Sequence, residues 1–331
     1  MIDVPAEYRD SRNGLSPGFK NGVLNMDLVR GVISMIIVGA CSTPFGIAMG
    51  QAPRKKVDVS VLLFFTSLIA IAVCVPIGLA EGGFSKWPRR EFWITFGALF
   101  ICGVQNFFQL NLMSRAMRCG PNGIVWSLIQ CSFIFPFVAG ILFFHAKCTV
   151  FNVAGGASII AALLILGLQK DSDPASGGKW KLYAFITFLS TGIAQILSNL
   201  PSYFPGAEAI SSTWRTVFFY SGWAVGTVGG TLMFRGRHIA DTLKENLRSR
   251  AMWFFAVGLQ AIGIPSNIFL LYPGMNMLAR AGAGAIAYPL VVASGIVAFE
   301  FYAFAVLREK RNLPQIIAFI MTLAGIAALC R

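Results

Sequence analysis

The sequence predicts an all-α polytopic membrane protein whose ten transmembrane helices form two inverted five-helix repeats. Three observations lead to this fold class. First, the 331 residues are 56% hydrophobic and only 12% charged, whereas soluble proteins carry about 25% charged residues. Second, the apolar residues gather in ten long stretches, and about 20 residues of helix cross the roughly 30 Å of bilayer hydrocarbon. Third, the second half of the chain repeats the pattern of the first half.

Breaks at charged residues, proline and glycine delimit the ten expected spans. They are residues 29–50, 59–80, 91–114, 119–144, 149–168, 180–200, 211–234, 251–278, 280–306 and 312–330. Residues 1–28 are polar and contain several Pro and Gly residues, so they predict a flexible tail, and 29–50 is a first transmembrane helix in preference to a cleaved signal peptide. The segment 170–179, rich in Asp, Ser and Gly, links a first repeat at 29–169 to a second at 180–331.

The repeat becomes visible when the chain is shifted by 162 positions against itself. This shift pairs Arg118 with Arg280, Gly120 with Gly282, Ile124 with Ile286, Leu128 with Leu290, Ser132 with Ser294 and Phe137 with Phe299. Five spans in each half is an odd number, so two copies of one fold enter the membrane in opposite orientations. This is the inverted-repeat architecture of secondary transporters, which bind their substrate between the two halves.

The 27 Lys and Arg residues give a net charge of +13, but they stand in short clusters between apolar stretches. This distribution is typical of loops at a membrane surface and predicts no binding of nucleic acid. The expected loops on the side of the termini carry 10 of these residues and those on the other side carry 16. The positive-inside rule therefore predicts that the termini face outward.

Enzyme and metal chemistry lack the required residues. The chain has two histidines, seven cysteines without a C-x-x-C spacing, no HExxH, no GxSxG and no paired aspartates in the apolar stretches. Glycine loops that bind phosphate are absent as well. The sequence thus predicts that the protein is not an enzyme, needs no cofactor and holds no metal.

The end of the chain, LREKRNLPQIIAFIMTLAGIAAL, and the paired helices 120–144 and 282–306 resemble the drug/metabolite transporter superfamily. Glu309 matches the glutamate at the helix end of that superfamily, although Arg308 replaces the preceding glycine and the first half has His145, Ala146 and Lys147 instead. The resemblance is to an EamA-like branch or to the sugar-uptake branches, similar to rhamnose and glucose permeases. It implies a transporter with both termini in the cytoplasm, opposite to the charge count.

Five amide side chains inside the third and eighth expected spans are candidate ligands. Gln105, Asn106 and Gln109 fall within two helical turns, and Gln260 and Asn267 stand seven residues apart on one helix face. Amides both donate and accept hydrogen bonds, so they bind hydroxyl groups without adding charge. Two interpretations are open, because amides in membranes also join helices to one another.

A second stripe follows the fourth expected span. Asn122, Trp126 and Gln130 are four residues apart and therefore share one helix face. In the repeat, Trp126 corresponds to Tyr288, so an aromatic ring occupies this position in both halves. These rings would stack on a flat or sugar-like ligand, or pack against a neighbouring helix.

Prolines interrupt the first and sixth expected spans at Pro44 and Pro201. Because proline lacks a backbone donor and frees a carbonyl, both helices are expected to bend or break there. Asn199 precedes Pro201 and shares a helix face with Gln195 and Ser198. Broken helices expose backbone to substrate in many transporters, so Asn199 is a further candidate ligand.

Two charged residues inside the apolar stretches have a functional and a structural interpretation. Glu300 is the only carboxylate deep in such a stretch, and it would couple transport to protons or pair with a basic side chain near Arg308. Arg215 lies one turn into the seventh span and would contact an anionic substrate group or reach the membrane interface. The same span contains Gly222, Gly226 and Gly230, which indicate close helix packing and could serve a homodimer.

Together these features predict a secondary transporter that moves a small polar metabolite, sugar-like or amino-acid-like, by alternating access. The expected location is the lipid bilayer of the cell membrane, as a multi-pass integral protein. If Glu300 does not titrate, exchange or facilitated diffusion remains. The alternative from another class is a non-transporting membrane scaffold that binds a ligand or lipid through the glycine face of the seventh span.

Overall fold

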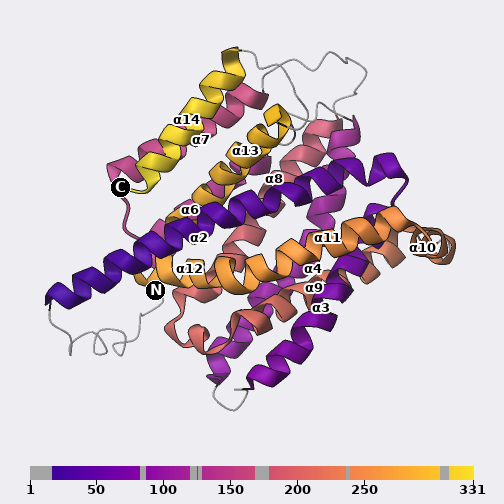
Figure 1. The fold of residues 1–331 in the computed structure, drawn as a ribbon, viewed down its shortest axis with the longest axis horizontal. Helices are drawn as coiled ribbons and strands as arrows, with labels where there is room; N and C mark the ends of the chain where they lie inside the picture. Colours follow the sequence, from indigo (N-terminus) through magenta and orange to yellow (C-terminus); the bar gives the residue numbers. More distant parts are fainter. Residues whose placement is uncertain are drawn as a thin grey trace.

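The computed structural model describes residues 17–82, 87–119, 125, 129–167, 179–235, 239–305 and 313–331. Within these ranges the chain folds into helices and contains no β-strand (Figure 1). Five described helical segments are long and apolar enough to cross a membrane: Met26–Met49, Val59–Glu81, Arg89–Met117, Trp180–Tyr203 and Arg250–Arg280. Shorter apolar helices accompany them. The chain is thus an α-helical membrane protein.

Most described helices overlap the expected spans, although only part of the span 119–144 is described as helical and a break at 281–286 interrupts the span 280–306. In the first half they are α2 (Pro17–Gln51), the 3-10 turn η1 (Pro53–Lys55), α3 (Val59–Glu81), α4 (Arg89–Cys119), the 3-10 turn η3 (Cys131–Phe133), α6 (Ile134–Phe144) and α7 (Val150–Gly167). In the second half they are α8 (Lys179–Asn199), the 3-10 turns η4 (Leu200–Tyr203) and η5 (Pro205–Ala209), α9 (Ser212–Arg235), α10 (Ile239–Leu247), α11 (Arg250–Pro265), the π-helix η7 (Ser266–Leu271), α12 (Tyr272–Arg280), the 3-10 turn η8 (Gly284–Ile286), α13 (Ala287–Ala305) and α14 (Leu313–Leu329). The helix α2 begins inside the segment predicted as a flexible tail.

Capping residues explain several helix starts. The carboxylate of Asp58 accepts hydrogen bonds from the backbone N–H of Ser60 at 2.9 Å and of Val61 at 3.2 Å, which begins α3. Before α7, Thr149 and Asn152 bond each other's backbone N–H groups at 2.9 and 3.1 Å. These polar caps stand at the ends of apolar helices, where the unpaired backbone donors would otherwise be exposed.

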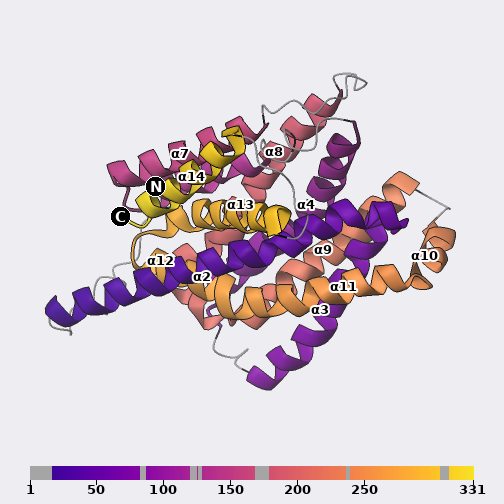
Figure 2. The ribbon, with the colours of Figure 1, turned by 45° about the horizontal axis from the view of Figure 1, so that its top comes forward.

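Glycines bring the helices of the two halves into close contact. On α9, Gly222 and Gly226 lie directly against the backbone of Phe100 and Val104 in α4, and a Cβ at either glycine would collide with it. The pair α7 and α14 meets in the same way at Gly155 and Gly325 (Figure 2). Small residues allow such backbone contacts where lipid provides no hydrophobic driving force between helices.

The prediction that the glycine face of α9 serves a homodimer is wrong for this conformation. The α4 helix of the same chain covers that face, and Gly230 packs against the ring of Phe107. The sequence pattern identified a tight helix contact correctly, but a glycine stripe does not reveal which helix fills it.

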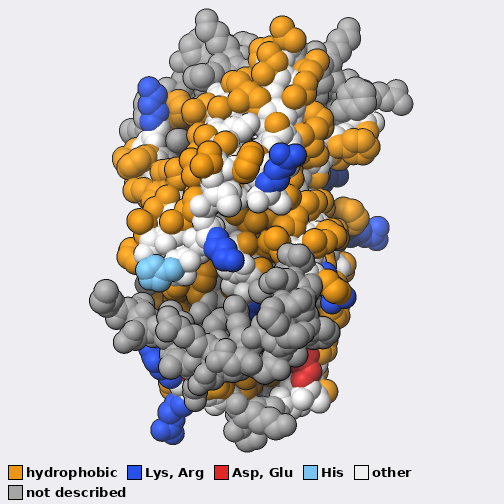
Figure 3. Space-filling view, turned by 90° about the vertical axis from the view of Figure 1, so that its left-hand side faces the viewer, with side chains coloured by type: hydrophobic (Ala, Val, Ile, Leu, Met, Phe, Trp, Pro, Cys, Tyr) orange, Lys and Arg blue, Asp and Glu red, His pale blue; other side chains and the backbone are white. Residues whose placement is uncertain are grey.

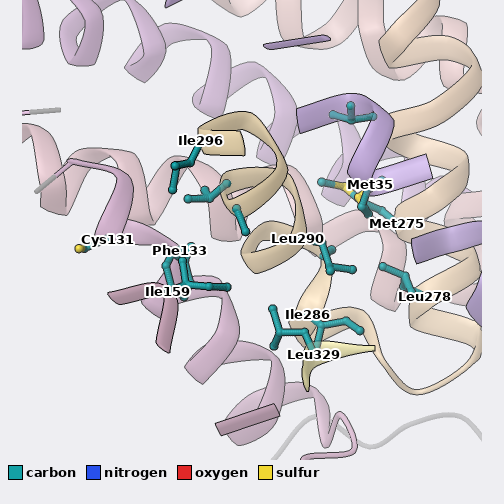
Figure 4. Close-up of a cluster of buried hydrophobic side chains, with 14 of the residues drawn as sticks. Met35, Cys131, Phe133, Ile159, Met275, Leu278, Ile286, Leu290, Ile296 and Leu329 are labelled. Carbon is teal, nitrogen blue, oxygen red and sulfur yellow. The ribbon is translucent and has the colours of Figure 1, made fainter. Parts of the chain in front are cut away.

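One buried apolar cluster joins helices from both ends of the sequence. Met35 of α2 packs with Met275 and Leu278 of α12 and with Leu290 of α13 (Figure 4). In contrast, large apolar side chains lie exposed along the outside, including Met233 at 78%, Phe254 at 75% and Phe143 at 67%. A soluble protein rarely shows such a surface, whereas lipid hydrocarbon covers it at no cost.

Candidate functional site

A cavity of about 290 Å³ lies in the interior, between helices of the two halves. The residues that line it come from α2, α4, the segment before η3, α8, α9, η7, α12 and α13: Ser42, Phe45, Cys102, Asn106, Gln109, Leu110, Met113, Ile129, Gln130, Thr191, Ala194, Gln195, Ser198, Phe219, Asn267, Leu271, Tyr272, Tyr288, Val291 and Val292. The expected spans one, three, four, six, eight and nine all contribute. The cavity has the mixed apolar and polar lining of a small-molecule site.

Five of the predicted ligands line this cavity: Asn106, Gln109, Gln130, Asn267 and Tyr288. They come from four segments far apart in the sequence, and all five side chains are only partly buried although they lie inside the helix bundle. In the part of the chain that the structure describes, the buried Oε1 of Gln109 has no hydrogen-bond partner. A buried carbonyl oxygen without a partner is costly, so in this conformation other atoms of Gln109 line the cavity.

Gln105, the neighbour of Asn106, serves a structural contact instead. Its Nε2 donates to the backbone oxygen of Ser190 at 2.6 Å and to the Ser190 Oγ at 3.1 Å. Successive residues of an α-helix point about 100° apart, so Gln105 faces α8 while Asn106 faces the cavity. Within this amide cluster, Gln105 therefore makes a contact between helices, whereas Asn106 lines the cavity.

Gln260 and Asn199 also lie outside the cavity lining. Gln260 is buried on α11 beside Tyr220, whose phenol interacts with both Gln260 and Asn267. The two amides do share a side of the helix, but seven residues separate them by about 10 Å along its axis. Asn199 is 2% exposed, and its Nδ2 donates to the backbone oxygen of Gly284 at 3.2 Å.

Residues of α8 and α12 were not predicted as ligands but line the cavity. Thr191, Gln195 and Ser198 follow one another at spacings of four and three, which is the signal of one helix face and was available in the sequence. Tyr272 lies at the start of α12, and Ser42 precedes Pro44 in α2. No sequence pattern distinguishes Tyr272 from the other aromatic residues of the chain.

The backbone is irregular where the cavity meets the eighth expected span. Here α11 ends at Pro265, and Asn267 and Leu271 lie in the π-helix that follows. At Pro201 the prediction of a helix break is confirmed, because α8 ends at Asn199 and a 3-10 turn follows. At Pro44 the prediction of a break is wrong, since α2 continues as an α-helix through that residue.

Polar and aromatic contacts gather at one end of the bundle, which we call the bridged end, and several of them join the two halves. Arg280 pairs with Asp27 at 3.0 Å and with Glu208 at 2.9 Å, and the rings of Phe144 and Tyr203 stack with centroids 4.0 Å apart. The backbone N–H of Lys147 donates to Gly282 O at 2.8 Å, and Asn199 holds Gly284 as described above. Pro17 and the C-terminus lie on this side (Figures 1 and 2), and Figure 3 faces it, with scattered Lys and Arg side chains among hydrophobic ones.

Arg215 is buried and does not line the cavity. The side chain is 1% exposed, its Nη1 donates to Asn276 Oδ1 at 2.9 Å, and its Nη2 donates to Ala207 O at 2.6 Å. Both proposed roles, a contact with an anionic substrate and an outward reach, are therefore wrong in this conformation. Arg215 instead fixes the η5 turn to α12 beside the bridged end.

Several predicted residues fall outside what the structure describes. Asn122, Trp126 and Glu309 belong to undescribed segments, and the side chain of Glu300 in α13 is not described. Among the described residues that line the cavity none is Asp, Glu, Lys, Arg or His. Within the same part of the chain, no three His, Cys, Asp or Glu side chains gather as metal ligands would.

No protein-family model and no curated protein matches this chain. The chain is similar in fold to a solved crystal structure, named only as that of a protein, with a TM-score of 0.63 and 14% sequence identity. The similarity covers 90% of this chain and 97% of that one. At this identity the likeness concerns the fold alone, so function has to be argued from the cavity.

Proposed function

We propose that the protein is a secondary transporter that moves a small polar metabolite across the cell membrane by alternating access. The single observation that carries this proposal is the internal cavity of about 290 Å³, which both halves of the chain line with amide and hydroxyl side chains. A helix bundle that served only as a scaffold would gain stability by pairing these groups or replacing them. The resemblance of the sequence to drug/metabolite transporters points to the same class.

The helix contacts support the inverted repeat on which this mechanism rests. In the proposed duplication the helices α2, α3, α4 and α7 correspond to α8, α9, α11 with α12, and α14. The contact of α4 with α8 then corresponds to that of α12 with α2, and the contact of α4 with α9 corresponds to that of α11 with α3. The pair α7 and α14 corresponds to itself, as expected for a twofold relation.

The bridged end fits one closed gate of such a carrier. The stack of Phe144 on Tyr203 and the ion pair of Asp27 with Arg280 each join a residue of the first half to one of the second. When the two halves rock and this end opens, these contacts must break. New contacts at the opposite end, which closes, must then replace the stabilisation that is lost. Alternating access is therefore an exchange between two sets of contacts around one site.

The coupling mode depends on Glu300, which we keep as the candidate proton-coupling residue. If its carboxyl takes part, the carrier is a proton symporter or antiporter; otherwise it is an exchanger or a facilitative carrier. The matched variants are Glu300→Gln, which removes the charge, and Glu300→Asp, which keeps it. Unchanged accumulation and unchanged pH dependence in Glu300→Gln would exclude proton coupling through this residue.

The transporter itself is tested in reconstituted vesicles. Compounds that raise the melting temperature of the purified protein are selected from sugars, amino acids and nucleosides, and each is then measured by solute counterflow. We expect at least one of them to exchange across the vesicle membrane only when the protein is present. Binding without any exchange, for every selected compound, would contradict the proposal and favour a scaffold.

A second test, which uses the compound identified by counterflow, asks whether the bridged end must open during transport. Phe144→Cys with Tyr203→Cys places two thiols where the stacked rings now meet, and a short thiol cross-linker should hold the bridged end closed. Counterflow should then stop and return after reductive cleavage of a cleavable cross-linker. The controls are the two variants that carry only one of the new cysteines. After treatment with the same reagent, each of them should keep its activity.

A further inference from the structure

The charges and hydrogen-bonding groups that line the cavity limit which ligands it can bind. This inference rests on the transporter function proposed above. On the described lining, five amides (Asn106, Gln109, Gln130, Gln195 and Asn267) stand with hydroxyl groups and two phenols, and no ionisable acid or base of the Asp, Glu, Lys, Arg or His type is among them. The site therefore offers many hydrogen bonds and no compensating full charge.

A charged ligand would lose its hydration in such a site without gaining a counter-charge. Desolvation of one ion in a protein interior costs several kcal/mol even after relaxation, and it is recovered only through an opposite charge in good geometry. The buried guanidinium of Arg215 is already bonded to Asn276 and Ala207, neither of which lines the described cavity. Acidic, phosphorylated and cationic solutes are thus disfavoured.

The amides also define what a neutral ligand must provide. Each amide group has two N–H donors and one carbonyl acceptor, so a ligand that only accepts, or only donates, leaves part of the set without partners. The hydroxyl groups of Ser42, Thr191 and Ser198 on the same lining both donate and accept. A hydroxyl group donates and accepts at once and suits both needs.

The size and the rings of the cavity narrow the class further. A volume of about 290 Å³ lies at the lower limit of the roughly 300–1,000 Å³ found for small-molecule pockets. Phe45, Phe219, Tyr272 and Tyr288 add apolar and aromatic faces to this lining. Aromatic rings pack on the C–H faces of sugar rings and on flat bases, while the amides bond the hydroxyl edges.

We propose that the cavity selects an uncharged solute with several hydroxyl groups, of the size of a monosaccharide or a nucleoside. Among the alternatives, an organic cation would use the aromatic rings but would leave the amide N–H donors without acceptors. An amino acid would place both of its charges in a site that compensates neither. Both remain outcomes of the test.

The experiment compares ligands that share a ring and differ in charge. Thermal shift of the purified full chain is measured with neutral aldoses, alditols and nucleosides, and with glucose, glucosamine and glucuronate as a matched set at mildly acidic pH. Choline and serine represent the cationic and zwitterionic alternatives. We expect the neutral compounds alone to stabilise the protein, with at least about tenfold weaker binding of any charged partner of the best aldose.

Variants of Gln109 make the result specific to the cavity. Gln109→Glu keeps the shape and adds a carboxylate, so it should weaken binding of the best neutral sugar and strengthen binding of its amino-sugar partner. Gln109→Met keeps the approximate volume and removes the polar end, so it should weaken both. A melting temperature close to that of the unaltered protein without ligand shows that each variant is folded.

The outcomes separate this inference from the transporter function. Best binding by glucosamine, glucuronate, choline or serine overturns the neutral class, and counterflow of that compound would leave the transporter standing. Absence of stabilisation by every neutral probe also overturns the class. A neutral sugar that binds but does not exchange across vesicles supports the class and contradicts transport.

Discussion

The cavity and the bridged end contain similar side chains in different surroundings. At the bridged end, the amide of Asn199 donates a hydrogen bond to the backbone oxygen of Gly284, and the guanidinium of Arg280 pairs with two carboxylates. In the cavity, Gln109 keeps a buried carbonyl oxygen without a partner in the described part of the chain, and Asn106 faces the open volume. Buried atoms without a partner occur in both regions, since Asn199 Oδ1 and Arg215 Nε also lack one in the described part of the chain. What distinguishes the cavity is that its amides line an open volume.

The difference teaches that burial alone does not identify a binding residue. Arg215 and Asn199 are among the most deeply buried polar residues described, yet both serve the packing around the bridged end. A binding residue in this bundle is one whose hydrogen-bonding capacity is unused and directed at a volume. Variants that remove polar groups from either region should thus separate stability from binding.

The largest effect on stability is expected from Arg215→Met. The change removes two hydrogen bonds from a buried cation and leaves the oxygens of Asn276 and Ala207 without their donor. Hydrogen bonds to charged groups contribute about 1.5–3 kcal/mol each, and part of this is offset because the buried charge disappears. We expect a net loss of about 3 kcal/mol, measured as a lower unfolding midpoint in detergent.

Arg215→Lys is the matched variant for the charge alone. Lysine keeps a cation but lacks the planar fork that reaches both acceptors, so it should be destabilised nearly as much as Arg215→Met. Full stability of the lysine variant would show that the charge, and not the geometry of the two bonds, stabilises the η5 turn.

The next effect compares two neighbouring amides of α4. Gln109→Met should reduce ligand affinity at least about tenfold, which corresponds to roughly 1.4 kcal/mol, and should leave the unfolding midpoint nearly unchanged. Gln105→Met should do the reverse, because it removes the bonds to Ser190 and costs about 1 kcal/mol of stability. Equal effects of the two variants on binding would erase the distinction between the helix contact and the cavity.

A smaller difference is expected between the asparagines. Asn199→Leu removes the bond to Gly284 and the 3.3 Å contact with the Tyr203 hydroxyl, so stability should fall by about 1–2 kcal/mol. Asn106→Leu should change stability by less than about 0.5 kcal/mol, since its side chain faces the cavity. Thermal unfolding without a neutral sugar measures the stability of each variant, and unfolding with the sugar measures how well it still binds.

A modest change in stability is expected from Arg280→Gln. Its two ion pairs are about one third exposed, with side-chain exposures of 36% for Arg280 and 35% for Glu208, so they are worth about 1 kcal/mol or less and weaken with salt. The rate of counterflow should nevertheless change, because the pair of Arg280 with Asp27 joins the two halves at the bridged end. A rate that is independent of salt in the unaltered protein would contradict that role.

Much of this arrangement could be predicted from the sequence, for physical reasons that particular residues illustrate. The helix bounds follow from hydropathy and from charges or caps at the membrane surface, as at Asp58 before α3. The stripes around Asn106 and Tyr288 pointed to cavity residues because polar groups in lipid must face inward. The inverted repeat and the transport function stay predictions.

The remainder depends on tertiary packing that a single sequence does not encode locally. Whether Gln105 or Asn106 faces the cavity depends on the rotation of α4, which Gly222 of α9 fixes through its contact with Phe100. The π-helix after Pro265 has no sequence signature that separates it from a simple kink. Likewise, nothing near Arg215 in the chain reveals that Asn276 will be its partner.

The pair formed by α7 and α14 has a practical consequence. Neither helix contributes a residue to the described cavity lining, and the exposed thiols of Cys148 and Cys330 lie just before the first helix and just after the second. A fluorophore or spin label attached there would report on movements of the bundle without touching the solute. This pair is thus a built-in attachment point from which the motion of a single molecule can be followed.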